Sequence, residues 1–388
     1  MIMKRYYFGK DEQIYKGGQS MIIMDIRINN FFAFKNFHIN MSYPKKIVDS
    51  SIEYEYLEER PNFRYKKVNI LMGGNATGKT SLGKMLMLFA NYCEDEQYDR
   101  FYEAINDSSE PASLSVDFVT EENVLYRVEL EIGVETGSVD EERVVIEDIF
   151  AVDIGVRDNY EICASKIDEG NCVLVSSIKE LDTSGWHFSY PADARKYKYY
   201  YSIEDDPKYI KVLEQILKTL DPSVENVIKV KEIANTYAIK LNHRSIIIQD
   251  GKILDTEVLS SGTKAGLDIS YIIASLVCDR HALYYCDELF SYVNSDIEKA
   301  CLSIMIEKLS GRKQLFFTTH NTDILDMQLP KHSFTFLKKD VKDTHTSVKC
   351  INAATYLKRN TDSLKHAVEN DLFAVSPDLD KLYEIVDM

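Results

Sequence analysis

Residues 66–92, "KKVNILMGGNATGKTSLGKMLMLFANY", decide the fold. The β-prone run "VNILM" leads into a glycine-rich loop, and an apolar periodic run follows, so the segment predicts a strand, a loop and a helix. The loop matches the pattern G-x-x-x-x-G-K-[ST] at Gly73, Gly78, Lys79 and Thr80. Glycines let backbone N–H groups curl around phosphates, lysine adds a positive charge, and the threonine hydroxyl binds Mg²⁺.

This context disfavours the alternative of an ordinary glycine turn before a helix, so we predict a site for ATP and Mg²⁺. The predicted ATP-binding residues are Gly73, Gly74, Asn75, Ala76, Thr77, Gly78, Lys79, Thr80 and Ser81.

Two carboxylates end the β-prone stretch "ALYYCDELF" at 282–290. An aspartate at the end of a buried strand can hold Mg²⁺, and the following glutamate can orient or deprotonate an attacking water. We therefore expect Asp287 to join Thr80 at the metal and Glu288 to act on water. Solvated acids at a strand end are the alternative, which a P-loop in the same chain weakens.

A second strand, in "FFTTHN" at 316–321, ends just before His320. This histidine follows Glu288 by 32 residues (320 − 288), which leaves room for one helix and one strand. Parallel strands place their carboxyl ends at one sheet edge, so His320 is expected near the phosphates, where it could contact the γ-phosphate. A lone histidine after a strand is more often structural.

The stretch "LSSGT" at 259–263 opens onto another apolar periodic run. Taken alone it is a loop with a serine helix cap. Together with a P-loop, a "DE" strand and a strand-end histidine, in that order, it resembles the signature loop of ABC-type ATPase heads. That resemblance implies that Ser260, Ser261, Gly262 and Thr263 bind the γ-phosphate held by a second protomer. Ser261 replaces the first glycine of the family motif, and Thr263 stands where glutamine is common.

Within these ATPases the chain looks most like the RecF, SMC and OLD-like group. "IRINNFFAFKNFHI" (26–39) resembles the opening strands of that group, and "LDPSVENV" (220–227) and "QLFFTTHNTDILD" (314–326) resemble OLD-like ATPases of phage-defence operons. Only 68 residues (388 − 320) follow His320, too few for the TOPRIM nuclease of OLD. The resemblance implies an ATPase, with Lys79, Glu288 and His320 in its chemistry, that dimerises on ATP and switches a separate effector, a nuclease or toxin.

Three other functions stay open. A DNA-repair head of RecF or SMC type has the same motifs. A transporter subunit does too, although Lys79 and Ser260 lie 181 residues apart (260 − 79), far more than in transporter cassettes. An interaction module could also bind ATP without turnover. The basic aromatic run "RKYKYYY" (195–201) could stack bases and contact phosphates, or it could be a tyrosine-rich strand or partner surface.

The composition fits a soluble protein of the cytoplasm. The 388 residues are 45% hydrophobic and 28% charged, with a net charge of −16, which argues against a surface coated for nucleic acid. Seven cysteines are scattered without metal-ligand spacing, and no run is apolar and long enough to span a membrane or serve as a signal peptide. No membrane contact is expected.

We therefore expect an α/β P-loop NTPase, an ABC-type ATPase head with an N-terminal antiparallel β-subdomain, a mostly parallel core sheet flanked by helices, and a small helical insertion. Strands are expected in 21–43, 113–133 and 143–178, a helix over 205–223, and strands again from about 240. The expected divisions are an extension at 1–20, with Met1 or Met21 as the start, the first part of the head at 21–178, the insertion at 179–240, and the second part at 241–388.

Overall fold

The computed structural model describes most of the chain, in two compact units. The first, here the P-loop unit, comprises Gln19–Phe188, Leu283–Asp287 and Ser310–Met388, and the second, the α5 unit, contains Ser189–Ala282 and Glu288–Leu309. The residues described are 21–47, 50–96, 98–134, 143–181, 185–190, 206–234, 236–249, 252–253, 261–342, 345–359, 362–373 and 383–387. The extension at 1–20 and the run at 195–201 lie outside them.

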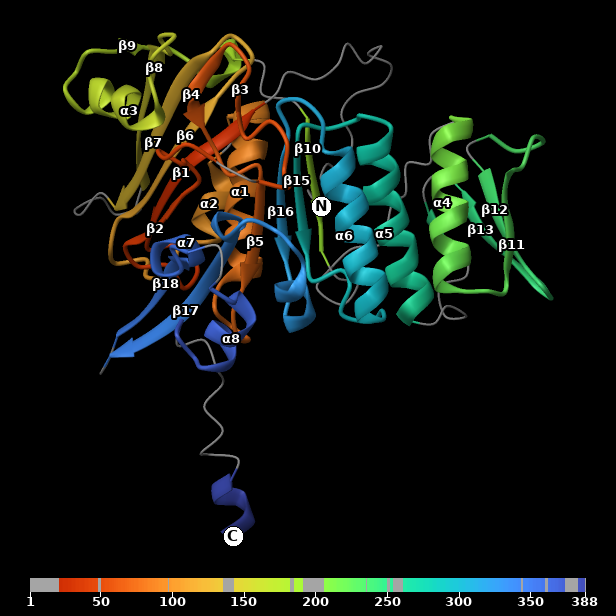
Figure 1. The fold of residues 1–388 in the computed structure, drawn as a ribbon. Helices are drawn as coiled ribbons and strands as arrows, with labels where there is room; N and C mark the ends of the chain where they lie inside the picture. The colour runs from red at the N-terminus through yellow and green to blue at the C-terminus, as the bar shows by residue number, and fades with distance from the viewer. Residues whose placement is uncertain are drawn as a thin grey trace. The chain divides into compact units, whose positions relative to one another are not determined.

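The core sheet of the P-loop unit is mostly parallel, as the sequence predicts (Figure 1). Its strand order is β10-β15-β16-β5-β17-β18, in which β15, β16, β5 and β17 are parallel neighbours and β18 is antiparallel to β17. The strands are β5 (Val68–Met72), β10 (Trp186–Ser189), β15 (Leu283–Asp287), β16 (Gln314–Thr318), β17 (Phe334–Lys342) and β18 (His345–Asn352). β5, β15 and β16 are buried along their whole length, which explains their continuous apolar runs.

A second sheet of this unit is antiparallel, which confirms the predicted β-subdomain. Its strand order is β2-β1-β6-β7-β8-β9. The strands are β1 (Ile22–Asn29), β2 (Phe37–Asn40), β6 (Ala112–Val119), β7 (Val124–Val134), β8 (Arg143–Asp153) and β9 (Val173–Leu174). A short hairpin pairs β3 (Tyr56–Leu57) with β4 (Arg60–Arg64).

The helices of the P-loop unit are short except for α1. They are α1 (Lys79–Asp95), α2 (Asp99–Tyr102), α3 (Tyr160–Asp168), α7 (Ala353–Tyr356) and α8 (Leu364–Glu369), with 3₁₀ turns at Ile178–Glu180, Thr322–Asp326, Lys331–Ser333 and Glu384–Asp387.

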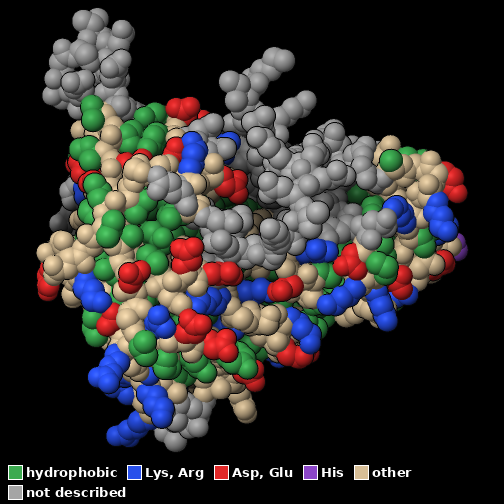
Figure 2. Space-filling view, turned by 90° about the horizontal axis from the view of Figure 1, so that it is seen from above, with side chains coloured by type: hydrophobic (Ala, Val, Ile, Leu, Met, Phe, Trp, Pro, Cys, Tyr) green, Lys and Arg blue, Asp and Glu red, His purple; other side chains and the backbone are tan. Residues whose placement is uncertain are grey.

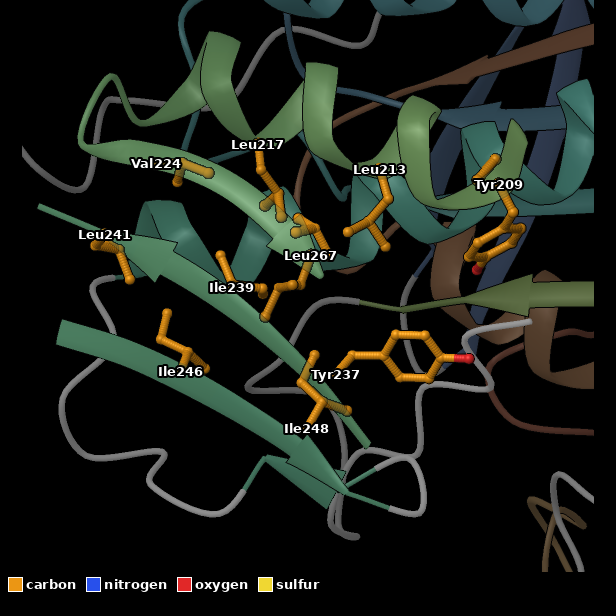
Figure 3. Packing of buried hydrophobic residues seen from close by; sticks show 12 residues of the cluster. Tyr209, Leu213, Leu217, Val224, Tyr237, Ile239, Leu241, Ile246, Ile248 and Leu267 are labelled. Atoms are coloured by element: carbon orange, nitrogen blue, oxygen red, sulfur yellow. The ribbon is translucent and has the colours of Figure 1, made fainter. Parts of the chain in front are cut away.

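The α5 unit packs helices against a small antiparallel sheet. Its elements are α4 (Pro207–Leu220), β11 (Val224–Lys229), β12 (Thr236–Leu241), β13 (Arg244–Gln249), β14 (Lys252–Ile253), α5 (Ser261–Val277) and α6 (Ser295–Lys308). Figure 3 shows Leu213 and Leu217 of α4 and Leu267 of α5 meeting Ile239 and Ile248 of the sheet. This core fixes the helix that begins at the predicted signature loop.

The helix predicted at 205–223 is confirmed, and its ends follow from its capping residues. Asp206 accepts a hydrogen bond from the Lys208 backbone N–H, Pro207 occupies the first turn, and the helix stops before Asp221. The expectation that strands return only near 240 is wrong, because β11 begins at Val224. Asp221 accepts from the Ser223 N–H through Oδ1, and this turn sends the chain directly back along α4.

The strand expected at 171–178 is also shorter than predicted. β9 contains only Val173 and Leu174, and both side chains are about two-thirds exposed, at 67% and 65%. Burial on one face normally holds a strand in register, so a strand exposed on both faces stays short. Ser177 then caps a 3₁₀ turn by accepting from the Lys179 N–H.

Three buried lysines lie at the amino ends of the core strands. Lys66 and Lys67 precede β5, and Lys313 precedes β16. Burial lowers the pKa of each from 10.5 to about 8. Between the pKa of about 8 in the folded chain and 10.5 in the unfolded chain, these lysines bind more protons when the chain is unfolded. The free energy of unfolding must therefore rise as pH increases. Cys163 and Cys301, which are buried, and Cys350, which is half-buried, have raised pKa values and act in the opposite direction above pH 9.

We expect the free energy of unfolding to increase by about 1–2 kcal/mol between pH 7 and 8.5. Urea unfolding at these two pH values measures it. Lys67→Met removes one of three similar contributions and should reduce the increase by about a third, whereas Lys339→Met, at an exposed position of β17, should not change it. A stability that falls from pH 7 to 8.5 would contradict the burial of these ammonium groups.

Candidate functional site

The predicted P-loop lies between β5 and α1, as the sequence requires. β5 ends at Met72 and α1 begins at Lys79, so the first turn of a 17-residue helix contains Lys79, Thr80 and Ser81. Lys79 Nζ donates to the backbone oxygens of Gly73 and Gly74, at 2.9 and 3.0 Å. The ammonium group is thus held inside the loop, where phosphate oxygens can replace the two carbonyls.

The remaining loop residues form an open arch. Asn75 and Ala76 are exposed, and Ala76 has a left-handed backbone with φ of 59°. Thr77 is buried and donates its hydroxyl to the Gly74 carbonyl at 2.9 Å. With the N-terminal end of α1 behind it, this arch offers backbone N–H groups to an anion.

Asp287 is the buried acidic centre of the site. It ends β15, is 1% exposed, and accepts two threonine hydroxyls, Thr80 at Oδ2 and Thr318 at Oδ1, both at 2.7 Å. Thr318 ends β16, which lies between β15 and β5 in the sheet. Parallel pairing therefore brings the ends of three strands and the start of α1 to one place.

The donors at this point fit Mg²⁺. A threonine hydroxyl and a carboxylate oxygen, 2.7 Å apart, are hard oxygen ligands of the kind that this ion prefers. Thr318 holds the other carboxylate oxygen and so orients Asp287 toward Thr80. Thr318 is absent from the sequence prediction, because its role depends on which strand lies beside β15.

Tyr285 is a second contributor that the sequence prediction missed. Its hydroxyl, buried in the P-loop unit, donates to the backbone oxygen of Lys79 at 2.6 Å. Its ring lies so close to α1 that a Cβ on Gly83 would be 2.4 Å from Cε1. Tyr285 and Asp287 are two residues apart and so share a face of β15. A glycine inside a helix, which costs about 1 kcal/mol, was the available signal of a close approach.

We expect Tyr285→Phe to weaken Mg²⁺–ATP binding about 5-fold, because a buried hydrogen bond contributes roughly 1 kcal/mol and this one fixes the first turn of α1. Titration with a fluorescent ATP analogue measures the change. Tyr65→Phe is the matched control, since Tyr65 is also fully buried and its hydroxyl has no hydrogen-bond partner among the described residues. Equal affinities of the two variants would show that the Tyr285 hydroxyl does not position the loop.

The other predicted residues divide between the two units. His320 is exposed and follows Thr318 at the carboxyl edge of the sheet, where adjacent-strand pairing was expected to place it. Glu288 is half-buried, belongs to the α5 unit, and has a left-handed backbone with φ of 48°. Such a backbone is costly for a residue other than glycine and is common at functional sites.

The predicted signature loop is described only from its end. Ser261 is the first residue of α5, followed by half-buried Gly262 and by Thr263, all in the α5 unit. Ser260 lies outside the described residues. The four predicted residues thus lead into the N-terminal end of a 17-residue helix.

None of the helices in the described residues is both apolar enough and long enough to span a bilayer. In the same part of the chain, no three histidine, cysteine or acidic side chains cluster as metal ligands would.

Similar solved structures include Smc heads and RecF. The Smc head bound to the C-winged helix domain of ScpA is 12% identical, with 87% of this chain and 100% of that chain covered and a TM-score of 0.50. A Smc head with an extended coiled coil, bound to the C-terminal domain of ScpA derived from Pyrococcus furiosus, is 11% identical (87% and 98% covered, TM-score 0.48). The recombination mediator protein RecF with a bound ATP analogue is 12% identical (86% and 99% covered, TM-score 0.42). The likeness to the first shows the fold, that of a P-loop ATPase head.

A comparison with curated proteins found no match. A family model described as "AAA domain, putative AbiEii toxin, Type IV TA system" matches residues 68–326. The match begins with β5 and ends after β16, so it includes the P-loop, the start of α5, and the Asp287 and His320 positions. The chain belongs to this family of AAA domains.

Proposed function

We propose that the chain binds ATP with Mg²⁺ and hydrolyses it slowly, as one half of an ATP-dependent dimer. The observation that carries the proposal is the buried Asp287 carboxylate, bonded to Thr80 at the start of α1 and to Thr318 at the end of β16. A strand-end carboxylate held against the P-loop threonine is the arrangement that ATP hydrolysis requires of a P-loop protein.

Each predicted site residue of the P-loop unit then has a distinct role. The Lys79 ammonium leaves the carbonyls of Gly73 and Gly74 and binds the β- and γ-phosphate oxygens. Thr80 and Asp287 hold Mg²⁺, which when bound offsets the charge of the phosphate oxygens. His320, at the same sheet edge, donates to the γ-phosphate and so distinguishes ATP from ADP.

Glu288 is proposed to orient the attacking water and accept its proton. Its carbonyl accepts both the backbone N–H and the hydroxyl of Ser291, at 3.3 and 2.8 Å, so a tight turn holds its left-handed backbone. A fixed backbone limits the positions that the carboxylate can reach, which favours a defined role in the reaction.

The signature loop is proposed to act on a second protomer. Ser260, Ser261, Gly262 and Thr263 would bind the γ-phosphate of the ATP in the partner's P-loop. Small side chains allow close approach of the backbone, and the positive end of the α5 dipole favours the anion. ATP would thus join two chains, and hydrolysis would release them.

We further propose that this association switches a separate effector, a nuclease or toxin, in defence against phage. Support comes from the family description, which names a putative toxin of a Type IV toxin–antitoxin system, and from the sequence resemblance to OLD-like ATPases. In this proposal the ATP-dependent association of the chain is the switch, and the nuclease or toxin carries out the defence reaction.

A DNA-maintenance ATPase like SMC or RecF is the second candidate, favoured by the head fold. On the face shown in Figure 2, Lys and Arg side chains of the described residues lie interspersed with Asp and Glu, mostly over the lower part of the view. Such a surface offers little continuous attraction to phosphates. DNA binding that is ATP-dependent and is lost on charge reversal at Arg195, Lys196 and Lys198 would favour this candidate.

The test is molar mass by light scattering for Glu288→Gln, which should retain ATP because hydrolysis is blocked. We expect a doubling of mass on addition of ATP and Mg²⁺. Adding the Ser261→Arg substitution should abolish this doubling, because the bulk of arginine keeps the loop away from the partner's phosphate.

Turnover is measured as phosphate release by the wild-type chain, which should be lost in Lys79→Ala. Phosphate release by Lys79→Ala at the wild-type rate would reject the proposed site.

A further inference from the structure

The antiparallel sheet of the P-loop unit has an outer edge that is covered at one end only. β8 pairs with β7 over its full length without a register shift. On its other side, β9 pairs only with Phe150 and Ala151, and Val175 donates its N–H to the Ile149 carbonyl at 2.8 Å. Within the described ranges, no strand pairs with this side of β8 from residue 143 to residue 148.

The backbone groups that face this edge can be identified from the pairing. The Ile149 carbonyl faces the β9 side, and N–H and C=O groups alternate sides along a strand, so residues 143, 145 and 147 present theirs outward. The side chains of Val144 and Ile146 share one face of the strand and are 45% and 54% exposed. An open row of hydrogen-bonding groups therefore lies beside exposed apolar side chains.

Proteins usually block such edges with proline, lysine or a bulge, because an open edge pairs with other strands. In the β8 segment "RVVIED" (143–148) the charged residues lie at the two ends, and its middle, Val144 to Ile146, contains no charge, no proline and no bulge. Figure 2 shows hydrophobic side chains gathered on the side where Figure 1 places β8 and β9. This edge is therefore suited to strand addition.

We propose that the edge pairs with the same edge of a second copy of this chain, antiparallel about a two-fold axis that passes Val145. The occupant is inferred from self-complementarity, which an isologous contact requires. With Val145 opposite Val145 of the second copy, position 143 faces position 147, and both positions have outward backbone groups. Val144 then lies opposite Ile146 of the second copy, on the exposed apolar face.

The two symmetric registers with the axis shifted toward the carboxyl end of β8 are worse. A shift by one position of the axis, to Ile146, sets Val145 opposite Glu147 and Val144 opposite Asp148, which buries acids against apolar side chains. A further shift sets Glu147 opposite itself, and like charges directly opposite are destabilising. In the proposed register the sequence provides an arginine at position 143 to face Glu147, which the Tyr98 hydroxyl holds through Oε2.

This interface is independent of nucleotide and goes beyond the proposed function. β8 belongs to a different sheet from the P-loop strand β5. A chain with two different isologous contacts, one through ATP and one through β8, assembles beyond a dimer, into closed particles or open chains. The paired segment is short, so the contact alone is expected to be weak and concentration-dependent.

Cysteine cross-linking tests the register directly, without nucleotide. Facing residues of a hydrogen-bonded antiparallel pair have Cα atoms about 5.5 Å apart, within the range of a disulfide. Val145→Cys should form a covalent dimer under mild oxidation, at least 5-fold more than wild type with its seven native cysteines. Val144→Cys and Ile146→Cys should each fail alone, but form a heterodimer when mixed.

The matched control is Val173→Cys, at an exposed apolar position on the neighbouring edge strand β9. It should cross-link no more than wild type. Cross-linking of Val144→Cys as strong as that of Val145→Cys would overturn the register. A wild-type chain that stays monomeric at every concentration, or an edge that is occupied by a different protein while the chain does not self-associate, would overturn the interface.

A non-covalent measurement keeps the proposal testable if a cysteine variant misfolds. Val145→Pro removes one outward N–H and leaves the β7 ladder intact. In nucleotide-free sedimentation it should raise the dimer dissociation constant at least 10-fold, with Leu174→Pro unchanged, because the N–H of Leu174 faces away from β8. Equal self-association of both variants with wild type would reject pairing through β8.

Discussion

Gly73→Ala is expected to abolish ATP binding, with at least a 100-fold loss of affinity, while the rest of the chain stays folded. A Cβ at this position would lie 2.3 Å from the backbone oxygen of Leu337 and 2.9 Å from Thr77 Oγ1. Gly73 also has φ of 155°, a backbone conformation that side chains rarely adopt. The alanine must displace the loop, and with it the carbonyl that holds Lys79.

The backbone oxygen of Leu337 cannot move away from the added Cβ, and the effect is therefore large. The Leu337 oxygen is part of β17, which pairs with β5 on one side and with β18 on the other. The loop must therefore move instead, and a misplacement near 1 Å at a phosphate site costs about 100-fold. Isothermal titration with ATP and Mg²⁺ measures the loss.

Gly133→Ala is the matched control for this substitution. Gly133 lies in β7, and a Cβ there would meet no atom within 4 Å, so alanine should leave ATP affinity unchanged. Gly73→Ala binding within 3-fold of the wild type would show that β17 does not constrain the P-loop. Thermal unfolding of both variants distinguishes a damaged loop from an unfolded chain.

The parts of the fold that could be predicted from the sequence are those determined by residues close together in the chain. Gly73, Gly78, Lys79 and Thr80 lie within one loop, so their spacing alone indicates their structure. The helix α4 carries its own stop and start signals, Asp206 and Asp221 among them. The buried strands β5, β15 and β16 are uniformly apolar because both faces of the sheet are covered.

The parts that the sequence did not predict depend on strand order. Thr318 meets Asp287 only because β16 pairs beside β15, and the Tyr285 hydroxyl meets Lys79, 206 positions earlier, only because α1 lies across that strand. Periodicity contains no information about neighbours in a sheet. The expectation that strands return only from about 240 failed for a related reason, since β11 is stabilised by packing against α4 and α5 rather than by its own propensity.

Asp287→Asn is expected to reduce ATP turnover at least 100-fold while leaving the nucleotide-free chain about as stable as wild type. The carboxylate and the Thr80 hydroxyl are the proposed ligands of Mg²⁺, and a carboxylate oxygen is the kind of ligand that this ion prefers. The neutral amide can keep a hydrogen bond to each hydroxyl, of Thr80 and of Thr318, but is a poor ligand for Mg²⁺. Phosphate release and thermal unfolding, each with and without Mg²⁺ and ATP, measure the two effects.

Asp117→Asn is the control, and this substitution is expected to destabilise the chain strongly. Asp117 is equally buried but binds Arg127 through both carboxylate oxygens, at 2.7 and 2.8 Å, and accepts the Tyr160 hydroxyl at 2.8 Å. The same substitution there leaves a buried guanidinium without its main partner, which costs about 3–5 kcal/mol. If Asp287→Asn were destabilising by a similar amount, Asp287 would be a structural acid like Asp117. A stable but inactive Asp287→Asn would identify a carboxylate that serves the metal rather than the fold.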